Sequence, residues 1–141
     1  MSVAVFRNVF SPGRQWEGCW HWFFPVWPPS VNHTWRNGGG GTHLDPKVRD
    51  FRSAMQGEMM IARSKHAMPK QALAGDLALE IVFYPPTAQK RDLDNLAKCP
   101  LDAFTHCGLW LDDSQVKDLH TSLGGSVPGG GFWARLRPLG E

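Results

Sequence analysis

The stretch LALEIVFY at residues 77–84 is the part of this sequence that decides the fold. Leucine, isoleucine and phenylalanine occupy its odd-numbered positions, and they alternate with Ala78, Glu80, Val82 and Tyr84. Alternation with a period of two predicts a β-strand with one clearly buried face. Pro85 and Pro86 end the strand, because proline cannot donate a hydrogen bond to a neighbouring strand.

A helix is predicted after the strand, over residues 92–106. Its apolar positions are Leu93, Leu96 (or Ala97), Leu101 and Phe104, and Gly108 follows as a stop signal. Pro100 lies inside this helix, where proline removes a hydrogen bond and clashes with the preceding turn at a cost of about 3 kcal/mol. We therefore expect a kink there or a helix that effectively starts later. Residues 116–123 and 132–137 are two further strand candidates.

A second helix is predicted before the strand. Asp45 is suited to cap its first turn and Pro46 to occupy the first helical position. Apolar residues then recur at helical spacing and mark a buried face: Val48, Phe51, Met55 and Met59. Further upstream, the aromatic residues 19–24 suit a strand, and Gly38 to Gly41 are expected to form a mobile loop.

The predicted order is strand, helix, strand, helix, strand, strand. This order fits one α+β domain in which a small mixed sheet is covered by helices on one face. A length of 141 residues suits a single domain, and 42% hydrophobic with 20% charged residues is ordinary for a globular protein. Residues 1–17 show little periodicity and are interpreted as an N-terminal extension of a domain over residues 18–141.

Composition also excludes several classes of protein. A net charge of +2 excludes a polycationic segment that binds nucleic acid by bulk charge alone. Three cysteines without a C-x-x-C spacing indicate reduced thiols in a cytoplasmic protein rather than a disulfide framework or a thiolate zinc site. No apolar run is long enough to span a bilayer, so no membrane association is expected.

Acidic residues concentrate in two segments. Asp92 and Asp94 are two positions apart where an extended segment enters the predicted helix, and Asp112 with Asp113 follow about twenty residues later. Carboxylates brought together repel one another unless a cation joins them, and Mg²⁺ prefers such oxygen ligands. Without these four aspartates the net charge of the chain is +6. A basic body around an acidic centre suits a metal-dependent enzyme that acts on a polyanion.

A purely structural interpretation of the same residues stays open. Asp92 could simply cap the helix, and Lys98 could pair with Asp94 one turn along its surface. Asp112 and Asp113 could form a polar turn. The functional interpretation requires the two acidic segments to converge, with Lys90, Arg91 and Lys98 supplying positive charge for a phosphate backbone.

Three segments together resemble the RusA family of Holliday junction resolvases, which are metal-dependent endonucleases. They are WPPSVN at residues 27–32, RDLDNLAK at residues 91–98 and GLWLDDSQV at residues 108–116. With LDAF at residues 101–104 they align from about residue 18 to residue 138. The second and third segments at this separation are much more specific than either acidic pair alone.

The resemblance implies the function and the site. It implies a homodimer that binds four-way junction DNA and makes paired symmetric nicks with Mg²⁺, through metal-activated attack of water on the phosphodiester. It implies no small-molecule cofactor. The implied roles are as follows: Asp92, Asp94 and Asp113 are catalytic metal ligands, Lys98 is the essential basic residue, and Asn95 and Asp112 support the site. Lys90, Arg91, Asn32 and Arg36 are the expected DNA-binding residues.

Two other functions are compatible with the sequence. The first is a DNA-junction-binding module of the same fold that does not cut, with Lys98 displaced by a kink at Pro100. The second is a small metal-binding protein whose carboxylates are structural. Five tryptophans between Trp16 and Trp35 suit core packing, a dimer interface or stacking on unpaired bases.

Overall fold

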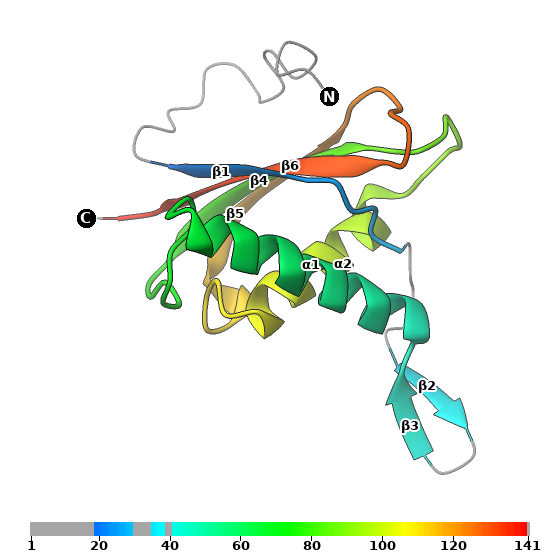
Figure 1. Cartoon of the computed structure of the whole chain (residues 1–141), viewed down its shortest axis with the longest axis horizontal. Coiled ribbons are helices and arrows are strands. Elements are labelled where there is room, and N and C mark those ends of the chain that lie inside the picture. Colours follow the sequence, from blue (N-terminus) through cyan, green and yellow to red (C-terminus); the bar gives the residue numbers. More distant parts are fainter. Residues whose placement is uncertain (1–18, 30–34, 39–40, 141) are drawn as a thin grey trace.

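The protein is built on a four-stranded mixed sheet (Figure 1). The structure, a computed structural model, describes residues 19–29, 35–38 and 41–140, with side chains for 19–29 and 45–140. The strands are β1 (Trp20–Phe24), β4 (Leu77–Tyr84), β5 (Val116–Leu123) and β6 (Gly131–Pro138). They lie side by side in the order β1-β6-β4-β5. β4 therefore has a neighbouring strand on each side.

The directions of the strands make the sheet mixed. β6 runs antiparallel to both β1 and β4, whereas β5 runs parallel to β4. In the parallel pair Leu77 lies opposite Val116 and Phe83 lies opposite Leu123. A parallel neighbour needs a crossover connection, and the helix between β4 and β5 provides it.

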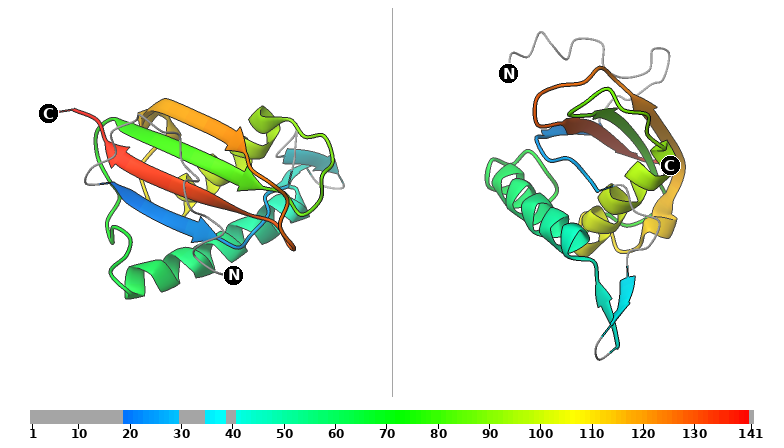
Figure 2. Two further views of the ribbon diagram at one scale, coloured as in Figure 1. Left: turned by 90° about the horizontal axis from the view of Figure 1, so that it is seen from above. Right: turned by 90° about the vertical axis from the view of Figure 1, so that its right-hand side faces the viewer.

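Two helices cover one face of the sheet (Figures 1 and 2), as the sequence predicted. They are α1 (Pro46–Ser64) and α2 (Leu93–His106). The carboxylate of Asp45 caps α1 by accepting a hydrogen bond from the Lys47 amide at 2.9 Å. The predicted apolar face of α1 is buried, and it packs in one core with the inner face of β4 and with Phe104 of α2. The α+β class and the single domain are confirmed.

Pro100 does not interrupt α2. The helix begins directly after Asp92 and continues through Pro100 to His106. The expectation of a later helix start is therefore wrong. Pro100 is one of the buried residues of α2. Asp94 and Lys98 consequently lie one regular helical turn apart.

Two short paired strands flank the centre of the expected mobile loop at Gly38 to Gly41. β2 (Trp35–Gly38) pairs antiparallel with β3 (Gly41–Leu44), and Trp35 lies opposite Leu44. The two strands project from the body beside the first turn of α1 (Figure 1). Gly38 and Gly41 therefore lie in paired strands instead of a loop, and residues 39–40 between them lie outside the described residues. The expected extension at residues 1–17 lies outside the described residues.

The sheet face opposite the helices buries an ion pair. Glu80 is fully buried, and Arg135 Nε donates to its Oε1 at 2.8 Å. A second guanidinium nitrogen of Arg135 lies 2.6 Å from the same oxygen. The three cysteines are free thiols. Within the described ranges, no helix has the length and hydropathy of a membrane span.

Candidate functional site

The first turn of α2 presents two carboxylates. Asp92 is the N-cap, and its Oδ1 accepts a hydrogen bond from the Asp94 amide at 3.1 Å. Asn95 Nδ2 lies 3.4 Å from the other oxygen, Asp92 Oδ2, and donates to it. The helix-capping interpretation of Asp92 is therefore confirmed. Because Asp92 and Asp94 are both exposed, they remain accessible to a cation or to DNA.

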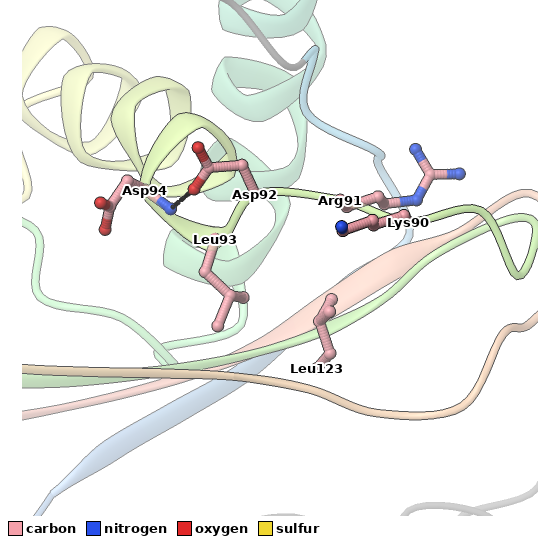
Figure 3. A pocket seen from close by; sticks show the side chains of 6 residues that line it. All are labelled: Lys90, Arg91, Asp92, Leu93, Asp94 and Leu123. Carbon is pink, nitrogen blue, oxygen red and sulfur yellow. Dashed lines mark hydrogen bonds between the residues drawn. The ribbon is translucent and has the colours of Figure 1, made fainter.

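Both carboxylates line one open pocket of about 660 Å³ (Figure 3). The connection after β4 supplies Lys90 and Arg91, and the end of β5 supplies Leu123. Lys90 is exposed and lines the same pocket as the two aspartates. The pocket therefore combines negative and positive charge at the end of the sheet where β4 and β5 finish. Such a surface suits a phosphate that is bridged to carboxylates by a divalent cation.

Arg91 is oriented by the aromatic segment near the start of the chain. Its guanidinium carbon lies 5.2 Å from the centre of the Trp27 ring, and Nη2 donates to Thr87 Oγ1 at 2.7 Å. Figure 3 shows the guanidinium pointing away from the carboxylates of Asp92 and Asp94. Trp27 also packs edge-on against Phe83, with the two ring centroids 6.0 Å apart. The segments at residues 27–32 and 91–98 thus meet through Arg91 and Trp27.

Two of the predicted DNA-binding residues have no described side chain, and three of the tryptophans pack in or against the core. Asn32 lies outside the described residues, and Arg36 belongs to β2, where the backbone alone is described. Trp20, Trp22 and Trp27 pack in or against the core. Trp22 Nε1 also donates to the Ala67 carbonyl at 2.7 Å. These three rings therefore contribute to the core, and Trp27 also contacts Arg91.

Gln115 organises the third segment, a role that sequence analysis missed. Its Oε1 accepts hydrogen bonds from the amides of Leu111 and Asp112, each at 2.9 Å. Its Nε2 donates to the carbonyls of Leu73 and Gly75, each at 2.9 Å. This one side chain therefore ties the acidic turn to the segment that leads into β4. The glutamine at a fixed distance after the two aspartates was the available signal.

The two acidic segments lie at opposite ends of the sheet. Asp92 follows the end of β4, whereas Asp113 begins the short 3-10 helix η2 (Asp113–Gln115) that leads into the start of β5. Because β4 and β5 are parallel, about 20 Å of strand separates these ends. Two oxygens that bind one Mg²⁺ lie at most about 4 Å apart. Among the described residues of one chain, no three acidic, histidine or cysteine side chains form a group that could hold a metal.

The remaining predicted site residues are Lys98 and Asp112. Lys98 is exposed on α2 one turn after Asp94. Asp112 is exposed at the acidic turn, where its carboxylate accepts a short hydrogen bond from Ser114 Oγ. The structure thus brings together Asp92, Asp94, Asn95 and Lys90, with Lys98 one turn further along α2. It keeps Asp112 and Asp113 apart from them within the chain.

Comparison with known proteins finds a matching protein family. A family model described as endodeoxyribonuclease RusA matches residues 25–130. The chain is 40% identical over 93 residues to the crossover junction endodeoxyribonuclease RusA of Escherichia coli K12, covering 65% of this chain and 72% of the relative. The protein of the same name from Enterobacteria phage 82 is 39% identical over 93 residues, with the same coverage.

A third relative extends the match along the chain. It is the crossover junction endodeoxyribonuclease RusA of Escherichia coli O139:H28, which is 34% identical over 116 residues. That alignment covers 82% of this chain and 92% of the relative. The match therefore includes both the pocket at the start of α2 and the acidic turn before β5.

Proposed function

Because the chain belongs to the RusA family and is an endodeoxyribonuclease, we propose that it resolves four-way DNA junctions by paired symmetric nicks. The relatives are named for crossover junctions, and this name is the basis for the proposed substrate. The observation that supports the proposal best is the pair of exposed carboxylates, Asp92 and Asp94, beside Lys90 in one open pocket. We place its action in the cytoplasm, where its DNA substrate would be.

We propose Mg²⁺ as the cofactor, held by Asp92 and Asp94. The donor set fits, because Mg²⁺ typically takes one or two carboxylates together with waters and phosphate oxygens. When bound, the ion would supply activation of water and polarisation of the phosphodiester. The hydrogen bond from Asn95 fixes the orientation of Asp92. Lys90 and Lys98 provide positive charge for the phosphate backbone on either side of the carboxylates.

Asp113 takes part, in this proposal, through a second copy of the chain. The resemblance implies that Asp113 is a metal ligand, yet it lies at the far end of β5 from Asp92 and Asp94. A two-fold homodimer can supply the partner's Asp113 to each site, and it then provides two equivalent sites for the two strands of a junction. Each nick would therefore require both subunits.

The experiment is a subunit-mixing assay on a labelled synthetic four-way junction with and without Mg²⁺. Asp92→Asn and Asp113→Asn are each expected to abolish cleavage. A heterodimer of these two variants retains one site with Asp92, Asp94 and the partner's Asp113 all intact, so nicking is expected to return. A mixture of Asp92→Asn with Asp94→Asn is the matched control, because every site in it lacks a ligand.

Each outcome separates the alternatives. No recovery in the first mixture, with active wild-type enzyme, would contradict the shared site. Junction binding without nicks by the wild-type enzyme would instead indicate a non-cleaving binding module. In that module Lys98 would be displaced by a kink at Pro100, whereas α2 extends from Leu93 through Pro100 to His106 as one helix. If the wild-type protein neither bound nor nicked the junction, the carboxylates would have only a structural role.

A further inference from the structure

Another pocket, of about 370 Å³, lies between α1 and the segment that follows β1. It is called the α1 pocket here, and the pocket of Asp92 and Asp94 is called the carboxylate pocket. One wall of the α1 pocket is the segment Val26, Trp27, Pro28 and Pro29. The other wall is a single stripe of α1 at helical spacing, formed by Lys47, Asp50, Phe51 and Ala54. The α1 pocket therefore lies at the end of α1 from which β2 and β3 project (Figure 1).

The walls of the α1 pocket are apolar and its mouth is charged. Pro28 and Phe51 are buried and Trp27 is half-buried, so proline and aromatic rings form the inner surface. Lys47 and Asp50 are both exposed and stand at the mouth. A nucleotide has matching parts, because its base is a flat ring with polar edges and its phosphate is an anion. Proteins hold an unpaired base between aromatic or apolar side chains and hydrogen-bond its edge.

Trp27 connects the α1 pocket to the carboxylate pocket. It lines the α1 pocket, whereas Arg91 lines the carboxylate pocket. The guanidinium carbon of Arg91 lies 5.2 Å from the centre of the Trp27 ring, so the two pockets share this pair of side chains as a boundary. A DNA strand that is held at Asp92 and Asp94 therefore passes beside the α1 pocket.

We propose that the α1 pocket binds one unpaired nucleobase from the branch point of the junction. This inference rests on the proposed function, because the base belongs to the DNA that the carboxylate pocket would cut. Unpairing costs least where a base has already lost its partner or its stacking neighbour, as at a branch point. Lys47 contacts the phosphate of the same nucleotide and does not distinguish the bases.

Asp50 determines which bases the α1 pocket accepts. Its carboxylate accepts a hydrogen bond from an exocyclic amino group, which adenine, cytosine and guanine carry. Thymine has no such group, and its one ring N–H lies between two carbonyl oxygens that a carboxylate repels. The α1 pocket is therefore expected to favour an amino-bearing base over thymine.

The test measures binding without cleavage, by fluorescence anisotropy in EDTA. Synthetic junctions carry one chosen base at the branch point of two opposing strands, with abasic nucleotides opposite, so that this base alone differs. The wild-type protein is expected to bind the adenine and cytosine junctions at least about 5-fold more tightly than the thymine junction. Asp50→Ala should bring this ratio close to one. Glu58→Ala is the matched control, because it removes the same charge two turns further along α1. Lys47→Ala should weaken binding of all the junctions equally.

Filling the α1 pocket provides a second variant. Ala54→Phe adds a ring at an exposed position of its wall, whereas Ser53→Phe adds the same ring at the neighbouring exposed position outside the lining. Ala54→Phe is expected to weaken binding of the adenine junction at least about 5-fold. It should leave unchanged the binding of a junction that is abasic on both strands. Ser53→Phe should bind both junctions as the wild-type protein does.

The outcomes separate the α1 pocket from the proposed function. Equal wild-type affinities for the adenine, thymine and abasic junctions would overturn the base-binding role, and so would unchanged binding by Ala54→Phe. A wild-type protein that still nicks the junctions with Mg²⁺ would then retain the proposed function. Base-dependent binding that Asp50→Ala and Ala54→Phe both remove, without nicks by the wild-type protein, would instead contradict the proposed function alone.

Discussion

Replacement of Gln115 by alanine tests whether one side chain holds the acidic turn in place. The substitution removes four hydrogen bonds, two accepted from Leu111 and Asp112 and two donated to Leu73 and Gly75. Each such bond contributes about 0.5–1.5 kcal/mol net. Gln115 is half-buried, so some of the released backbone groups regain water. We therefore expect Gln115→Ala to lower the free energy of unfolding by about 2–3 kcal/mol.

Denaturant unfolding and thermal melting measure this effect directly. For a domain of this size, a loss of about 2–3 kcal/mol corresponds to a decrease of about 6–10 °C in Tm. Ser114→Ala is the matched control in the same turn, because it removes one exposed hydrogen bond, to Asp112. It should cost less than about 1 kcal/mol. An unfolding free energy of Gln115→Ala within about 0.5 kcal/mol of the wild-type value would refute the assigned role.

Three further predictions concern charge and the buried thiol. Asp94→Asn should abolish junction cleavage while keeping or tightening junction binding, because it removes a negative charge near phosphate. An electrophoretic mobility shift measures the binding, and a parallel nicking assay measures the cleavage. Cleavage at the wild-type rate would exclude Asp94 as a metal ligand. Arg135→Met should destabilise the fold by about 3–5 kcal/mol, because it leaves the carboxylate of Glu80 buried without its guanidinium partner. The double variant with Glu80→Leu should recover most of that loss in urea unfolding. Similar unfolding free energies of the single and double variants would contradict this coupling. Burial raises the pKa of Cys99 from 9.0 to about 11. The stability that comes from keeping this thiol neutral is therefore present below about pH 9 and is lost as the pH rises towards 11. Cys99→Ala should weaken the alkaline decrease in unfolding free energy, and an unchanged decrease would contradict the assignment.

Periodicity predicted the elements that build the core. The alternation at residues 77–84 and the helical spacing from Val48 to Met59 both describe faces that the structure buries. The pairing of β2 with β3 was missed because the glycines at positions 38 and 41 were treated only as a sign of mobility. The spacing of Gln115 from Asp112 could have indicated its bonds to the turn, but its bonds to the carbonyls of Leu73 and Gly75, about forty residues earlier, have no local signal.

The position of Asp113 follows from topology, and the sequence already contained the reason. Asp92 precedes the helix that leaves β4, and Asp113 precedes the strand to which that helix leads. If the two strands are parallel neighbours, the loop into the helix lies at one end of the sheet and the loop out of it lies at the other. A helix of 14 residues, about 21 Å long, spans that distance but does not return the chain to its starting point. A parallel strand–helix–strand unit therefore cannot assemble the three aspartates by itself, so a metal site that used all of them would take carboxylates from two chains.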